Sequence, residues 1–181
     1  MEENPNCAIA GSKLVDFAGR LESNGGDFPF GFSLFNWLFN LEMFGGSSNF
    51  HRNDRDYYSV AHQVDWVSGT MMVIRTEALE KIGVFDEKFF MYFEDVELCY
   101  RAKKKGLKVM INPSVAIKHK SGSSSENPRF AQWKGEFAGL MKFYDKHLGF
   151  LGAFYARILI YIAICLRIVT FLVIGKVNKS A

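Results

Sequence analysis

Apolar residues occur in short runs, separated by turn-forming residues, over the first two thirds of the chain. Residues 7–15 (CAIAGSKLV) are small and apolar and predict a buried strand. Residues 64–75 (VDWVSGTMMVIR) predict a second buried strand, interrupted at Ser68-Gly69. Residues 107–120 predict two short strands on either side of Asn112-Pro113. With the helical patterns that lie between these runs, the order of elements predicts an α/β fold.

Three segments have the pattern of helices. Residues 77–82 follow Thr76, a predicted N-cap, and end at Gly83. Residues 94–105 place Glu97 and Arg101 one turn apart, where their charges can pair, and Gly106 ends this helix. A third helix is expected to begin at Pro128, after the Ser-rich linker 121–127. Its apolar stripe has helical spacing: Phe130, Trp133, Phe137, Leu140, Met141 and Tyr144.

An aromatic segment at residues 28–50 lacks a clean period and predicts a loop or a short helix. Two interpretations stay open for it. It either contacts lipid or a lipid-linked substrate, or it is a hydrophobic flap over the core.

The C-terminal part of the chain, from Phe150 to Ile174, is strongly apolar and is broken by Arg157 and Arg167. Within it, the stretch Ile158–Ile174 holds one charge, and its length approaches the roughly 20 residues that a helix needs to cross a bilayer. Both arginines lie near the ends of the apolar stretch, where they can reach the headgroups. The segment is therefore either a membrane-embedded or membrane-lying helix, or a helix packed within the protein.

Composition narrows the class of protein. The 181 residues carry a net charge of +3, too small and too dispersed for a nucleic-acid partner. The three cysteines, Cys7, Cys99 and Cys165, fit neither a disulfide framework nor a zinc site, which favours a reducing, cytosol-facing compartment. The first residues lack the pattern of a signal peptide. We expect a membrane-associated protein on the cytoplasmic face.

The acidic pair Glu94-Asp95 stands at the predicted start of a helix, directly after an aromatic loop. Backbone N–H groups and the helix dipole stabilise negative charge there, so both carboxylates are expected to be ionised near neutral pH. An ionised carboxylate can accept a proton from a sugar hydroxyl. Acids also occur in first turns simply because they cap helices, so the pair alone does not decide its role.

Several motifs occur in one order over residues 64–122: Asp65-Trp66-Val67-Ser68-Gly69, Gly83-Val84-Phe85-Asp86-Glu87, Phe93-Glu94-Asp95 with Leu98 and Arg101, and His119. This arrangement resembles the second half of family 2 glycosyltransferases, especially rhamnosyltransferase-like members, and the resemblance extends over residues 4–122. It implies the C-terminal part of a GT-A-type domain, with a mostly parallel sheet flanked by helices, followed by a hydrophobic helical tail. The corresponding division is 1–122, 123–148 and 149–181.

The resemblance also implies roles for individual residues. Asp95 would be the general base that deprotonates the acceptor hydroxyl, and Glu94 would position the acceptor or the base. His119 would complete a site for a divalent metal, Mn or Mg, although it could equally be an exposed strand-end histidine. Trp66 would form a wall of the acceptor pocket or be a core tryptophan. Gly69 would let the backbone approach a ligand or mark a bulge without function.

One departure from the family pattern concerns the donor. The family binds its nucleotide-sugar donor through a preceding βαβ region that ends in Asp-x-Asp, and no such region precedes the resembling segment in this sequence. Asp54-Arg55-Asp56 matches the motif literally but in the wrong order along the chain, so we interpret it as coincidence. We therefore expect a truncated inverting glycosyltransferase that transfers a rhamnose-like deoxyhexose to a glycan or lipid-linked acceptor. It would need a partner chain carrying the nucleotide-binding half. The alternative is a non-catalytic, membrane-attached remnant or interaction module.

Overall fold

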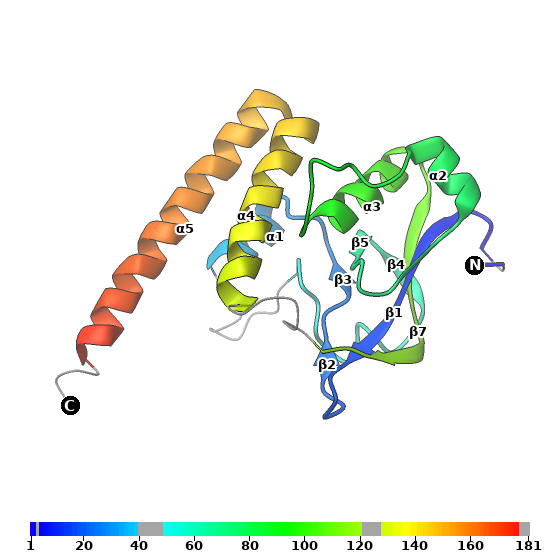
Figure 1. Ribbon diagram of the computed structural model, residues 1–181, viewed down its shortest axis with the longest axis horizontal. Coiled ribbons are helices and arrows are strands. Elements are labelled where there is room, and N and C mark those ends of the chain that lie inside the picture. The colour runs from blue at the N-terminus through cyan, green and yellow to red at the C-terminus, as the bar shows by residue number, and fades with distance from the viewer. Residues whose placement is uncertain (3, 40–48, 121–127, 178–181) are drawn as a thin grey trace. The chain divides into compact units, whose positions relative to one another are not determined.

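The computed structural model describes residues 1–2, 4–39, 49–120 and 128–177 (Figure 1). The chain divides into two compact units, Met1–Gly139 and Leu140–Ala181. The helix α4 (Pro128–His147) begins in the first unit and ends in the second. The division implied by the family resemblance, with boundaries after residues 122 and 148, stays a prediction.

The first unit is built on the strand β1 (Cys7–Val15), as the apolar run predicts. Its parallel neighbour is β7 (Lys108–Lys118), and Figure 1 shows the two strands side by side. The short strands β2 (Leu21–Glu22) and β6 (Met72–Ile74) pair with β1 in the antiparallel direction. The strand β4 (His62–Val64) pairs antiparallel with β7.

The α/β class is therefore confirmed, but the expectation of a mostly parallel sheet is wrong. Among the described pairs of strands in this sheet, β1–β7 is parallel and the others are antiparallel. A parallel pair needs a long crossover connection, whereas short strands can return beside a neighbour through loops. The strands β2, β4 and β6 have only two or three residues each and add to the sheet in that second way.

The predicted strand boundaries also change in two places. The run 64–75 divides among β4, β5 (Trp66–Val67) and β6, because the turn at Ser68–Thr70 separates β5 from β6. The two strands predicted around Asn112-Pro113 are one strand, β7. Its register against β1 shifts between Asn112 and Ala116. Proline has no N–H to donate to a ladder, so the irregularity lies where Pro113 stands.

Two described helices of the first unit follow the sequence pattern closely, and another lies in the aromatic segment that was expected to form a loop or a short helix. These helices are α1 (Gly31–Phe39), α2 (Thr76–Ile82) and α3 (Glu94–Lys104). Thr76 is the first residue of α2 and not its cap; Arg75 occupies the cap position without a side-chain hydrogen bond. Glycines at positive φ, Gly83 (76°) and Gly106 (74°), follow α2 and α3 as predicted. Within the aromatic segment 28–50, residues 40–48 lie outside the described residues.

The core of the first unit lies between the sheet and α3. The sheet contributes Ile9, Val109 and Ile111, and α3 contributes Leu98 and Cys99, all of them fully buried. The helix contacts β5, β7 and β1. The N-terminus of α3, with its two acids, is thereby held at one end of a rigid layer.

The second unit comprises the last turns of α4 and the helix α5 (Gly149–Val177). The carboxylate of Asp145 accepts hydrogen bonds from Arg157 at 2.8 and 2.9 Å. Small side chains of α5, Ala153, Ala156 and Ala163, are buried, whereas Phe150 and Tyr161 are among the large apolar residues left exposed. Within the described residues, Gly149–Val169 is the one helical segment long and apolar enough to cross a membrane, with a mean hydropathy of 1.9. It could be a membrane anchor.

Candidate active site

The first unit contains a cavity of about 810 Å³. The residues predicted from the sequence as site residues all line it: Trp66, Gly69, Glu94, Asp95 and His119. They come from β5, from the turn that follows it, from the start of α3 and from the end of β7. Elements far apart in the sequence therefore place these five residues around one cavity.

Asp95 is fixed by backbone donors on both of its carboxylate oxygens. Gly69 N donates to Oδ2 at 2.9 Å, and Val96 N donates to Oδ1 at 2.8 Å. Burial raises the pKa of Asp95 above its usual value, and these backbone hydrogen bonds and the nearby His51 act in the opposite direction. The direct bond between Gly69 and Asp95 joins the β5 turn to the start of α3.

Glu94 differs from its expected ionisation. Burial, and after it the neighbouring Asp95 charge, raises the pKa of Glu94 to about 7. The helix dipole and backbone donors were expected to keep both acids ionised, but desolvation outweighs them here. Oε2 of Glu94 is buried and has no hydrogen-bond partner among the described residues. Near neutral pH this carboxyl group is therefore poised between its protonated and ionised forms.

The two residues before the acids have strained backbones. Tyr92 and Phe93 have φ values of 68° and 73°, in the left-handed region that residues with a Cβ rarely occupy. Such strain costs about 1–2 kcal/mol per residue and persists where the surroundings enforce it. A Cβ on Gly135 of α4 would lie 2.1 Å from Tyr92 Cδ2, and one on Gly139 would lie 2.7 Å from Phe93 Cβ. These glycines let α4 approach the strained residues.

An aromatic cluster forms one wall of the cavity. The ring of Phe50 lies 5.0 Å from Trp66 and is stacked on Phe93 at 5.5 Å. Trp66 is 4% exposed and also lines the cavity, so it belongs both to the core and to the wall of the pocket. Its indole N–H is buried without a hydrogen-bond partner among the described residues. A flat apolar face beside polar groups is suited to a sugar ring.

The close packing of this wall depends on two glycines. Gly25 and Gly26 form the short strand β3 (Gly25–Gly26), which pairs with β5. A Cβ on Gly25 would lie 2.3 Å from the carbonyl oxygen of Trp66, and one on Gly26 would lie 2.1 Å from that of Phe50. The sequence suggests a turn here, whereas the structure uses both glycines to bring Trp66 and Phe50 together.

His119 lies directly after β7, where its backbone N–H donates to Val15 O at 2.9 Å. Its Nδ1 lies 2.8 Å from Oε2 of Glu22, which is held on β2 at the other side of β1. An imidazole and a carboxylate are suitable ligands for a divalent ion. However, no group of three or more His, Cys, Asp or Glu side chains comes together among the described residues. These residues alone do not form a divalent-metal site.

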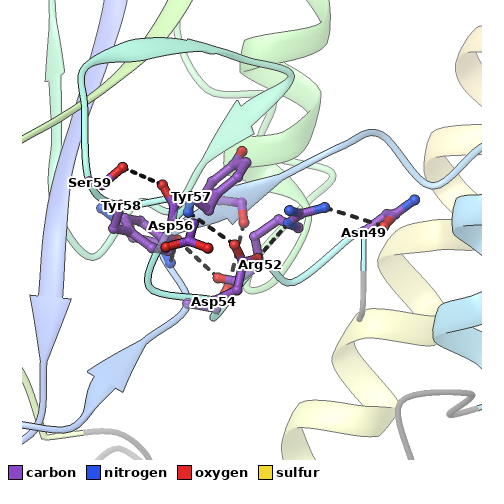
Figure 2. Close-up of polar contacts among 10 residues, drawn as sticks. Asn49, Arg52, Asp54, Asp56, Tyr57, Tyr58 and Ser59 are labelled. Atoms are coloured by element: carbon purple, nitrogen blue, oxygen red, sulfur yellow. Dashed lines mark hydrogen bonds and ion pairs between the residues drawn. The ribbon is translucent and has the colours of Figure 1, made fainter. Parts of the chain in front are cut away.

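The literal Asp-x-Asp sequence lies in a separate loop (Figure 2). Asp54 Oδ2 accepts a hydrogen bond from Arg52 Nε at 2.9 Å, and Oδ1 accepts one from Tyr57 N at 2.9 Å. The guanidinium of Arg52 also lies over the Tyr57 ring, 4.8 Å from its centroid. Asp54 therefore stabilises its own turn, and neither it nor Asp56 lines the cavity.

Other residues of the sequence motifs support the site without lining it. Asp65 pairs with Lys103 of α3 and accepts a hydrogen bond from Phe28 N at 2.8 Å. Arg101 pairs with Glu97, as the spacing predicts, and donates to the carbonyl of Val84 at 2.7 Å. These contacts anchor β5 and the loop after α2 to α3.

Sequence reasoning missed several residues of the cavity. Glu22, Phe50, His51, Gln132 and Glu136 all line it. Glu22, Phe50 and His51 precede the motif-bearing segment, whereas Gln132 and Glu136 lie on α4. A possible signal was the acidic residue Glu136 within an otherwise apolar helical stripe.

Comparison with known families gives a match to a model described as glycosyltransferase like family 2 over residues 47–133. The matched segment contains Trp66, Gly69, Glu94, Asp95 and His119. It ends before Glu136.

The chain is similar to several curated sugar transferases. It is 39% identical to N-acetylglucosaminyl-diphospho-decaprenol L-rhamnosyltransferase of Mycobacterium tuberculosis over 66 residues, 36% of this chain and 22% of that protein. It is 41% identical to the low-salt glycan biosynthesis hexosyltransferase Agl10 of Haloferax volcanii over 46 residues, 25% of this chain and 15% of that protein. It is 34% identical to rhamnosyltransferase WbbL of Escherichia coli over 56 residues, 31% of this chain and 21% of that protein.

The aligned segments thus span between 15% and 22% of the length of these relatives. The glycosyltransferase family 2 match and the rhamnosyltransferase and hexosyltransferase relatives together support a sugar transferase.

Proposed function

We propose that this chain forms the acceptor side, with the catalytic base, of an inverting glycosyltransferase. The observation that carries the proposal is the position of Asp95, whose carboxylate is held by Gly69 N–H and Val96 N–H in a cavity with an aromatic wall. A fixed carboxylate beside a surface suited to sugars is the arrangement that base-assisted attack by a sugar hydroxyl requires.

In the proposed reaction, the acceptor hydroxyl oxygen forms a bond to the anomeric carbon of the donor sugar. The bond from that carbon to the donor phosphate breaks, and the nucleoside diphosphate leaves with the electron pair. Asp95 accepts the hydroxyl proton. A single displacement from the face opposite the leaving group inverts the anomeric configuration.

Glu94 has a different role in this proposal. With a pKa of about 7, it is partly protonated at neutral pH and can either donate or accept a hydrogen bond. Its Oε2 has no partner among the described residues, so it is available to a hydroxyl of the acceptor. We assign Glu94 to acceptor positioning and Asp95 to proton transfer.

The donor is proposed to be a nucleotide-diphosphate sugar, with a rhamnose-like deoxyhexose favoured because two of the relatives are named rhamnosyltransferases. The acceptor is proposed to be a glycan or a lipid-linked sugar. Because the described residues do not form a metal site by themselves, we propose that a partner chain or further segment supplies the nucleotide-binding half and most ligands of a divalent ion. His119 would contribute one ligand.

Replacing His119 by Ala should then weaken metal-dependent donor binding, and an unchanged metal requirement would remove His119 from that role.

Membrane association on the cytoplasmic face is the proposed location. The support is the apolar segment Gly149–Val169 with its exposed large side chains, such as Phe150 and Tyr161. A lipid-linked acceptor would be presented at the same surface. Flotation of the full chain with liposomes tests the membrane association, and a chain that stays in the aqueous fraction would contradict it.

The decisive test of the function is transfer of a labelled sugar from nucleotide-diphosphate rhamnose to a lipid-linked acceptor by the full chain, alone and with a candidate nucleotide-binding partner. Replacing Asp95 by Asn should lower turnover by at least about 100-fold, the usual contribution of a general base. Asparagine has the same size, but its NH2 group would face one of the two backbone N–H donors to Asp95, so the denaturation midpoint of the variant must be measured beside its turnover. Turnover within a few-fold of the wild type would exclude Asp95 as the base.

A further inference from the structure

Glu136 is a buried carboxylate in the cavity that the proposed reaction does not use. It lies on α4 and is 6% exposed. Gln132 Nε2 donates to its Oε1 at 2.9 Å, and Nε2 of His51 lies 3.4 Å from the same oxygen. A buried acidic group is costly unless polar partners surround it. Gln132 thus holds this carboxylate by a hydrogen bond, and the His51 imidazole lies beside it.

The position of His51 is set by aromatic rings. Its imidazole contacts Phe50 at 4.4 Å and lies edge-on to Trp66 at 5.5 Å between ring centroids. His51 thus lies beside Glu136 on the wall that also contains Trp66. It is also near enough to Asp95 to act on the pKa of that carboxyl group.

Two further polar atoms in the cavity have unused hydrogen-bonding capacity. Among the described residues, neither Trp66 Nε1 nor Glu94 Oε2 has a partner, and both are buried. One is a donor and the other is an acceptor in the ionised form. Buried polar atoms are normally satisfied, so this pair indicates a ligand that both donates and accepts hydrogen bonds. Sugar hydroxyl groups do both.

The charges of the cavity restrict the kind of sugar. Its described lining includes the carboxylates of Glu22, Glu94, Asp95 and Glu136 and contains no lysine or arginine. Bringing a uronate or a phosphate against Glu136 would place like charges together in a partly desolvated site, which is unfavourable. An uncharged sugar instead offers hydroxyl donors to each carboxylate.

We propose that Glu136, held by Gln132 and lying beside His51, is a specificity-determining residue that accepts a hydrogen bond from a second hydroxyl of an uncharged acceptor sugar. Asp95 on α3 takes the reacting hydroxyl, and Glu136 on α4 contacts another hydroxyl of the same acceptor. This proposal rests on the proposed function and names its acceptor class: a neutral sugar with at least two free hydroxyl groups.

The test measures binding of small glycosides to the full chain in detergent micelles by ligand-observed NMR. The probes are methyl rhamnoside and methyl N-acetylglucosaminide as neutral sugars and methyl glucuronide as an acid. The wild type should bind the neutral probes in preference to the acid. Glu136→Gln keeps the size of the side chain and removes its charge. It should weaken binding of the neutral probes by about tenfold, since a hydrogen bond to a charged group is lost.

The matched control is Glu80→Gln, the same substitution at an exposed position of α2, which should leave binding unchanged. If Glu136→Gln does not fold, Gln132→Ala decides the question, because Gln132 is exposed and its loss removes a donor that orients Glu136. That variant should bind the neutral probes severalfold more weakly.

Three results would overturn the proposal: equal binding by wild type and Glu136→Gln, a preference of the wild type for the acidic sugar, or a wild type that binds none of the three. The proposed function is judged separately, by the effect of Asp95→Asn on sugar transfer. If Asp95→Asn lowers sugar transfer but Glu136→Gln leaves glycoside binding unchanged, the specificity role of Glu136 alone is refuted.

Discussion

Removing the side chain of Glu97 should destabilise the first unit strongly. Glu97 is fully buried, and Arg101 Nε lies 3.0 and 2.9 Å from its two oxygens. Arg101 also donates to the carbonyl groups of Ile82 and Val84. The substitution Glu97→Ala leaves Arg101 with a partly buried and unbalanced charge, and it weakens the attachment of the loop that leads to Glu94.

The size of the effect follows from burial. Removing one partner of a buried ion pair costs about 3–5 kcal/mol, whereas an exposed pair contributes about 0–1 kcal/mol. A change of 1 kcal/mol moves Tm by roughly 2–4 °C in proteins of about this size, so Tm should fall by roughly 6–20 °C.

Chemical denaturation of the full chain in detergent, followed by circular dichroism, measures the free energy of unfolding. The matched control is Arg20→Ala, which breaks the exposed pair Arg20–Asp16 at the same sequence spacing and should leave the midpoint nearly unchanged. The double variant Glu97→Leu with Arg101→Met should be less destabilised than Glu97→Ala, because it leaves no unpaired charge. A loss below about 1 kcal/mol for Glu97→Ala would refute the reasoning, because it would show that the pair behaves as a surface pair.

Three further predictions concern the candidate site. Gly69→Ala should not alter the denaturation midpoint, because the atoms nearest to a new Cβ belong to Asp95 and lie at 3.9 Å. Sugar transfer should nevertheless fall by about tenfold or more if a substrate approaches Gly69 closely. Glu94 has a pKa raised to about 7 from 4.5, so its contribution to stability is complete below pH 4.5 and is lost as pH rises to about 7. Glu94→Gln should therefore flatten the stability profile in this window, and an unchanged profile would contradict the assigned ionisation. Gly135→Ala should displace Tyr92 and lower the free energy of unfolding by about 1–3 kcal/mol through overpacking, and the better helix propensity of alanine offsets about 1 kcal/mol of this loss. Thermal unfolding measures the difference, and a more stable variant would show that Tyr92 moves freely.

The sequence predicted the helices better than the sheet. The helix of Glu94–Lys104 has a clear start, a clear end and an i,i+4 ion pair, all of which are local signals. The strand β3 has two glycine residues and no alternation, so local reasoning reads it as a turn. Its place in a sheet is set by Trp66 and Phe50, which lie far along the chain.

The same limit applies to the candidate site. Trp66, Gly69 and Asp95 lie in segments with recognisable motifs, and the structure brings them into one cavity. His51 and Glu136 belong to no motif, and their contact at 3.4 Å joins positions 85 residues apart (136 − 51). The ionisation of Glu94 was misjudged for a related reason, because helix-terminal charge stabilisation is readable from sequence whereas the desolvation that outweighs it depends on tertiary packing.

The pairing of β1 with β7 has a consequence for how this protein folds. Cys7 is aligned with Lys108, so the longest ladder of the sheet closes only after about a hundred intervening residues have been ordered or looped out. Contacts of such large sequence separation slow folding. During synthesis, β1 leaves the ribosome well before β7 has been made. Its apolar residues, including Ile9 and Leu14, therefore stay exposed to solvent until β7 can pair with β1. Any need for a chaperone to cover these residues should therefore end when β7 has emerged.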